Sequence, residues 1–256
     1  MSSTTFHVYR YQLLPKDRYF QGDLYGATSI DDAIARKNEF LAGALRSATL
    51  MANNRAETRV ELLFSDGDFW LFRMAVNRAL RHETEDFETE TIENWPKIYF
   101  AVWNDPHRQL IAVQHRPPAF KDTSAPIALL AKSLAPFLDA VQLRISIEKV
   151  QEIQRFWEMI RRHQGNIGAL RFELVTPNMA NISGDLADDL KDFAKRTNAV
   201  ESDLELKADD SASLKISESD PEISKLLQYS ADGGGNVSIR LKGSKKKVST
   251  SGAKEV

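Results

Sequence analysis

Arginine and lysine side chains in the second half of the chain are the residues whose type and spacing best suit a chemical task. Some fall on the polar side of one predicted helix, some alternate outward from predicted strands, and some lie in the C-terminal tail. The set comprises Arg155, Arg161, Arg162, Arg171, Arg240, Lys242, Lys245, Lys246 and Lys247. If these elements adjoin, we expect one cationic patch that contacts nucleic-acid phosphates. If they do not, the same residues form a solvated face and a solubilising tail.

Catalytic chemistry has less support in the sequence. The absence of cysteine excludes thiolate metal ligation, disulfides and a cysteine nucleophile. The five histidines lie in separate predicted elements, and none stands at metal-ligand spacing from another. We therefore predict no catalytic residue, no metal site and no cofactor, and we expect a binding protein rather than an enzyme. A metal-dependent, nuclease-like enzyme with dispersed carboxylates stays open, because such a site assembles in space.

Two further motifs have structural interpretations. The acidic run Glu83–Glu93 lacks the glycine and the regular ligand spacing of a calcium loop, so we predict a solvated connection between two strand pairs. The run from Asp232 to Asn236 contains three glycines and leads from a helix into a strand. A phosphate loop has the opposite order, so we predict a helix C-cap and a turn.

The elements that must position these residues begin with an N-terminal sheet. Phe6–Leu14 alternates aromatic and polar residues as a strand does, and Ser29 precedes an amphipathic helix from about Ile30 to Met51. Asp-Gly and Asp-Pro turns then predict two hairpins. The hairpins pair Val60–Phe64 with Phe69–Val76, and Lys97–Trp103 with Gln109–Gln114.

The C-terminal half repeats strands and helices in the order β-α-β-α-β-β-α-β. This order is compatible with a ferredoxin-like topology. The predicted elements are strand Leu143–Val150, helix Gln151–His163, strand Ala169–Thr176, a helix capped by Ser183, strands Leu204–Lys207 and Ser213–Ile216, helix Pro221–Tyr229 and strand Val237–Lys242.

The fold class is therefore α+β: an N-terminal antiparallel sheet with one long helix, then a ferredoxin-like α/β sandwich and a disordered basic tail. We predict an N-terminal domain over residues 1–122 and a C-terminal domain over 141–243. Residues 123–140 form a linking helix, which Pro136 should kink or split, and residues 244–256 form the tail.

Four segments carry a family resemblance. KIYFAVWND and QLIAVQH from the second predicted hairpin, with the later LRFELVTPN and NVSIRLKG, resemble RexA-type phage-exclusion proteins and related proteins of prophages and bacterial defence islands. The resemblance covers about half of the chain and implies a DNA-associated, dimeric protein that responds to phage infection alongside a partner protein. This chain departs from that expectation in having a net charge of −2 rather than a basic balance.

The expected function is a nucleic-acid-binding sensor or regulatory subunit of a bacterial anti-phage defence (exclusion) system. The alternative is a protein-interaction module that scaffolds or inhibits an effector partner through its sheet edges or the 126–140 helix. Expected partners are DNA, a protein encoded nearby and a second copy of the chain. Because the sequence shows neither a secretory leader nor an apolar membrane span, we expect a cytoplasmic protein without membrane insertion.

Overall fold

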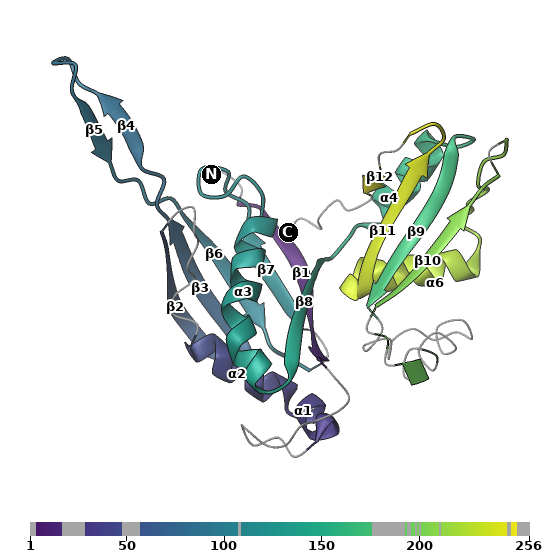
Figure 1. Ribbon diagram of the computed structural model, residues 1–256, viewed down its shortest axis with the longest axis horizontal. Helices are drawn as coiled ribbons and strands as arrows, with labels where there is room; N and C mark the ends of the chain where they lie inside the picture. The colour runs from purple at the N-terminus through teal and green to yellow at the C-terminus, as the bar shows by residue number, and fades with distance from the viewer. Residues whose placement is uncertain are drawn as a thin grey trace. The chain divides into compact units, whose positions relative to one another are not determined.

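Helices and strands occur in both of the units into which the chain divides (Figure 1). The computed structural model describes residues 4–16, 29–47, 57–106, 109–175, 193, 196–197, 199, 201–209, 211–244 and 247–249. The first unit lies within Met1–Val8 and Pro15–Ser146, and the second within Tyr9–Leu14 and Ile147–Lys254.

Most of the first unit is a six-stranded sheet with the order β2-β3-β6-β7-β1-β8, of which Tyr9–Leu14 in β1 and Ile147–Lys149 in β8 are grouped with the second unit. Its strands are β1 (Phe6–Pro15), β2 (Thr58–Asp66), β3 (Phe69–Val76), β6 (Lys97–Trp103), β7 (Leu110–Gln114) and β8 (Leu143–Lys149). The antiparallel pairs β2–β3 and β6–β7 confirm both predicted hairpins. Side chains alternate along β3, where Trp70, Phe72 and Met74 are buried, so one face of the sheet forms the core.

Helices lie on one side of this sheet (Figure 1). They are α1 (Ile30–Ala35), α2 (Lys37–Ser47) and α3 (Ser124–Ala140). The single long helix predicted from Ile30 is not confirmed, because Arg36, with φ −97° and ψ 8°, separates α1 from α2. Pro136 lies within α3 without dividing it, and α3 is part of the first unit, although it was predicted as the connection between domains.

A β-hairpin arm is inserted between β3 and β6. Its strands β4 (Leu80–Glu83) and β5 (Thr89–Ile92) form a separate two-stranded antiparallel sheet. Figure 1 shows that the hairpin extends away from the six-stranded sheet. The acidic run, predicted as a solvated connection, is therefore largely an ordered hairpin.

The second unit has a four-stranded sheet with the order β10-β9-β11-β12. Its elements are α4 (Ile153–Arg162), β9 (Ile167–Val175), β10 (Glu201–Lys207), α6 (Pro221–Tyr229), a π-helical turn η2 (Ser230–Gly234), β11 (Gly235–Leu241) and β12 (Lys247–Ser249). The ferredoxin-like topology is not confirmed, because β8, the first strand of the predicted C-terminal order, pairs within the six-stranded sheet and not with the strands of this one.

Three further sequence predictions concern the second unit and the C-terminal tail. Ser213–Ile216, predicted as a strand, is not part of one; instead Leu214 donates a single backbone hydrogen bond to Ile167 at 2.9 Å. Of the helix predicted after Ser183, only residues 193, 196 and 197 are described, and they are helical. The tail predicted to be disordered contains the short strand β12, and most of its other residues lie outside the described ones.

Candidate nucleic-acid interface

The sheet of the second unit has one buried and one open face. Leu170 and Phe172 point from β9 into a core that also contains Phe156 and Trp157 of α4 and Leu227 of α6. Because successive side chains on a strand point to opposite faces, the residues between them lie on the open face. This face carries the strand arginines that the sequence singled out.

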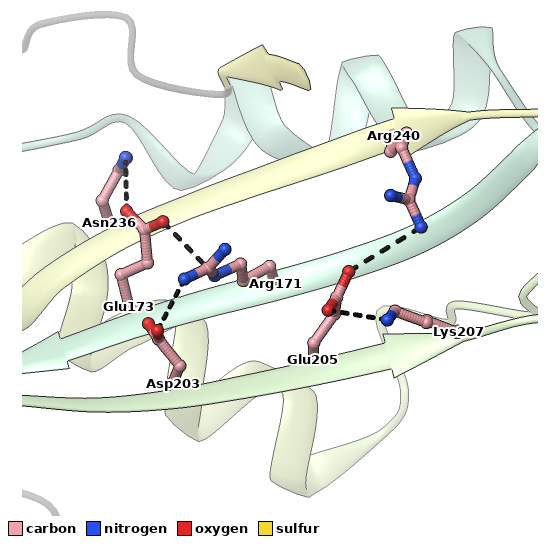
Figure 2. A network of polar contacts seen from close by, with 7 residues as sticks. All are labelled: Arg171, Glu173, Asp203, Glu205, Lys207, Asn236 and Arg240. Atoms are coloured by element: carbon pink, nitrogen blue, oxygen red, sulfur yellow. Dashed lines mark hydrogen bonds and ion pairs between the residues drawn. The ribbon is translucent and has the colours of Figure 1, made fainter. Parts of the chain in front are cut away.

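Carboxylates accompany the cations on this open face (Figure 2). Arg171 lies between Glu173, at 3.3 Å, and Asp203, at 2.5 Å. The hydrogen bond to Asp203 raises the pKa of the Arg171 guanidinium above its ordinary value. Two acidic partners therefore balance Arg171 in the middle of the sheet, which makes it a poor anchor for a phosphate.

A shallow hollow on the open face is too small for a nucleotide. It holds about 20 Å³, little more than one water molecule requires. Its lining includes Arg171, Glu205 and Arg240. A base or cofactor would thus have to rest on the surface rather than enter it.

Cations do gather at one end of the second unit. The strand register places Lys207 of β10 and Arg240 of β11 on either side of Ala169. The backbone amide of Lys242 donates to the carbonyl oxygen of Asn166 at 3.0 Å, which joins the end of β11 to the loop after α4. The last turn of α4 carries two exposed arginines. We call this surface the basic end and define it by Arg161, Arg162, Lys207, Arg240 and Lys242.

Three carboxylates reduce the charge of the basic end without cancelling it. Glu205 lies 3.2 Å from Lys207 and 3.8 Å from Arg240, and Glu218 lies 3.7 Å from Arg161. The pKa of Asp209 is lowered, mainly by hydrogen bonds from Ser211 and to a smaller extent by the charge of Lys242. Exposed ion pairs of this kind are weak, so these cations stay available to a phosphate.

The structure brings together only part of the predicted cationic set. Arg161, Arg162, Arg240 and Lys242 share the basic end, and the backbone of Lys247 in β12 pairs with that of Arg240. Arg155 lies in the first turn of α4, 2.8 Å from Glu152, and Arg171 lies in mid-sheet. Lys245 and Lys246 fall outside the described residues.

Lys207 belongs to the basic end but was not identified from the sequence. Its outward position follows from the alternation of ESDLELK, in which Asp203, Glu205 and Lys207 share one face. Its place beside Arg240 depends on the pairing of two strands with β9, which no local pattern encodes.

The glycine run before β11 has a packing role. A Cβ at Gly234 would lie 2.3 Å from the ring of Tyr229, and one at Gly235 would lie 2.0 Å from the carbonyl oxygen of Glu173. Tyr229 donates its hydroxyl hydrogen to the carbonyl oxygen of Val175, and burial raises its pKa to about 12. The predicted turn thus takes the form of a π-helical turn packed against β9.

Neither a metal centre nor a membrane-spanning helix is found in the parts of the chain that the structure describes. Within those parts, histidine, aspartate and glutamate side chains form no group of three or more that could hold a metal ion. The same residues include no helix with the length and apolarity needed to cross a bilayer.

Glu148 gives a pH-dependent prediction for the second unit. Desolvation, and then the charges of Glu173 and Glu201, raise its pKa. A raised carboxyl pKa disfavours folding once the group ionises, so this contribution to the free energy of unfolding falls as pH rises through the ordinary glutamate value of 4.5 and on through the raised value. We expect Glu148→Gln to be more stable than the wild type at pH 7 in urea denaturation, with the difference vanishing toward pH 4. Glu158→Gln, an exposed change on α4, should show no such trend; equal trends for both variants would contradict the assignment.

Comparisons of the chain with protein-family models, with curated proteins and with solved structures find no match. The fold and its site therefore define this protein only as a two-unit α+β protein with a cationic surface at one end of its second unit.

Proposed function

We propose that this chain is a nucleic-acid-binding regulatory subunit of a bacterial anti-phage exclusion system, acting in the cytoplasm. The observation that carries the binding activity is the basic end, where Lys207 and Arg240 flank Ala169 and the chain segments that carry Lys242, Arg161 and Arg162 lie at the same end of the unit. The role in phage exclusion rests on the sequence resemblance to RexA-type proteins.

The side chains of the basic end would be sufficient for this binding, without Arg155 and Arg171. Side chains at one end of a small unit contact the phosphate backbone without reading bases, so the binding would be sequence-independent and sensitive to salt. Lys245 and Lys246 follow soon after β11 in the sequence and add to the positive charge of this stretch of chain. A net charge of −2 for the whole chain restricts attraction to this surface.

Salt-dependent DNA binding tests the proposal. We expect the full chain to bind a duplex of about 20 base pairs in fluorescence anisotropy near 50 mM salt, and to release it as salt rises. The double variant Arg162→Gln/Lys242→Gln should bind more weakly, because it removes two phosphate-facing cations. The slope of log K against log salt should fall by about 0.9 for each phosphate that the variant no longer neutralises.

The control for this measurement is Arg155→Gln/Arg171→Gln, which makes the same change of charge outside the basic end. It should leave the affinity and the salt slope close to those of the wild type. Absence of binding by the wild type at low salt would refute the function. Equal weakening in both double variants would refute the location.

A further inference from the structure

The hairpin arm has no packing of its own to hold it. Every residue from 78 to 94 is exposed except Thr84, which is half-buried. A two-stranded hairpin by itself is at best marginally stable in water. An ordered arm of this kind therefore needs a surface to pack against.

Apolar side chains on the arm point to a protein surface. Phe87 near the tip is 97% exposed, and its φ of 61° lies in the left-handed region that a bulky residue seldom adopts. At the root of the arm, Leu80 and Ile92 face each other across the two strands and are 57% and 48% exposed. The arm thus exposes one apolar side chain at its tip and a pair of apolar side chains at its root.

The arm is acidic at its tip. Five exposed carboxylates lie on or between its strands, where the only basic side chains are those of Arg81 and His82. The carboxylates are those of Glu83, Glu85, Asp86, Glu88 and Glu90. A surface of this charge repels nucleic acid and attracts a basic protein surface.

The base from which the arm projects is basic. Arg78 donates to the carbonyl oxygen of Ala119 at 2.8 Å and lies over the ring of Phe120, and Arg116 donates to the carbonyl oxygen of Lys97 at 2.7 Å. These bonds to neutral oxygens fix the arginines without neutralising them. Lys121 is the next residue after Phe120. The cations at the base are Arg78, Lys97, Arg116 and Lys121, and the carboxylates of Glu93 and Asp122 are close to them in the sequence. Arg59 and Glu57, which also lie there, pair with each other at 3.3 Å.

The tip and the base of the arm are complementary in charge, and within one copy the hairpin extends so that its tip points away from its base (Figure 1). We propose that the acidic tip of each arm docks on the basic base of the arm in a second copy of this chain, reciprocally, around a two-fold axis. An isologous interface requires a surface that complements itself, and opposite charges at the two ends of one projection provide it. The stretch of chain from Arg78 to Phe87, if fully extended, spans about 30 Å, a length that allows a tip to reach the base of its partner.

This interface is independent of the proposed DNA binding. All its residues belong to the first unit, whereas the basic end belongs to the second. Disruption of the dimer therefore leaves the phosphate-binding side chains in place, and removal of DNA binding leaves the arm intact.

Sedimentation velocity of the full chain tests the interface. We expect a dimer at micromolar concentration near 50 mM salt, with a dissociation constant that rises on adding salt. The tip variant Glu85→Lys/Asp86→Lys/Glu88→Lys and the base variant Lys97→Glu/Lys121→Glu should each raise that constant by more than about tenfold, because like charges then meet. Circular dichroism confirms that each variant is folded.

Mixing the two variants gives the decisive result. The tip variant carries positive charge at tip and base, and the base variant carries negative charge at both, so an equimolar mixture should form a heterodimer that neither forms alone. The control variant Asp66→Lys/Asp68→Lys/Glu158→Lys changes three exposed carboxylates away from the arm and should dimerise as the wild type does. A monomeric wild type, a tip variant that still dimerises, or a mixture that stays monomeric would overturn the proposal.

Discussion

Replacing Gly235 with alanine is expected to lower the free energy of unfolding of the second unit by about 3 kcal/mol or more, because it forces a methyl group into occupied space. The new Cβ would lie 2.0 Å from the carbonyl oxygen of Glu173 and 3.0 Å from the Cα of Leu174. Both are backbone atoms of β9, the strand that pairs with β10 and β11. No change of side-chain rotamer relieves such an overlap, so β11 must move away from its neighbour.

A matched control for this prediction lies across the same strand pair. At Gly168 in β9 the nearest atom to an added Cβ is the carbonyl oxygen of Arg240, at an ordinary contact distance of 3.5 Å. Gly168→Ala should therefore leave stability unchanged or raise it slightly, since alanine loses less chain entropy on folding than glycine does. Urea unfolding followed by circular dichroism compares the two variants. Equal midpoints for both would contradict the packing role of Gly235.

Local patterns were sufficient for the hairpins of the first unit. The turn between β2 and β3 contains Gly67 at φ +52°, a conformation that glycine adopts at no steric cost. Burial along β3 alternates strictly, as its sequence pattern indicates. Such information lies within a few residues of chain, so it can be recovered without knowing the rest of the fold.

The arm could not be predicted in the same way, because its strands have no apolar face. All eight residues of β4 and β5 are exposed, and the segment between them is acidic. The alternation of apolar and polar residues that identifies a strand arises when one face of the strand is buried in its own chain. Neither face of the arm is buried in this way. The end of α1 at Arg36 was also not predictable from the sequence, because no glycine or proline occurs at that position.

The candidate site was predictable as a list of residues but not as a surface. Alternation within β9 and β11 indicates that Arg171 and Arg240 share the open face. Whether each of these cations is neutralised or joins other cations depends on contacts between residues far apart in the sequence. Arg171 is balanced by Asp203, 32 residues away, and Lys207 joins Arg240 only because both strands pair with β9. The local sequence therefore does not distinguish a neutralised arginine such as Arg171 from a cation that joins others, such as Lys207.

The second large effect is expected from Phe172→Ala, which should lower the free energy of unfolding of the second unit by about 3–5 kcal/mol. Phe172 is fully buried at the centre of β9, in contact with the core that α4 and α6 share. Its removal leaves a cavity between the sheet and both helices, and the basic end depends on that packing because its cations come from α4 and from the strands beside β9. We therefore expect DNA affinity and the urea midpoint to fall together in this variant. Phe137→Ala makes the same substitution at a residue of α3 that is 42% exposed, and it should change the DNA affinity and the urea midpoint little. A Phe172→Ala variant as stable as this control would contradict the assignment of the core.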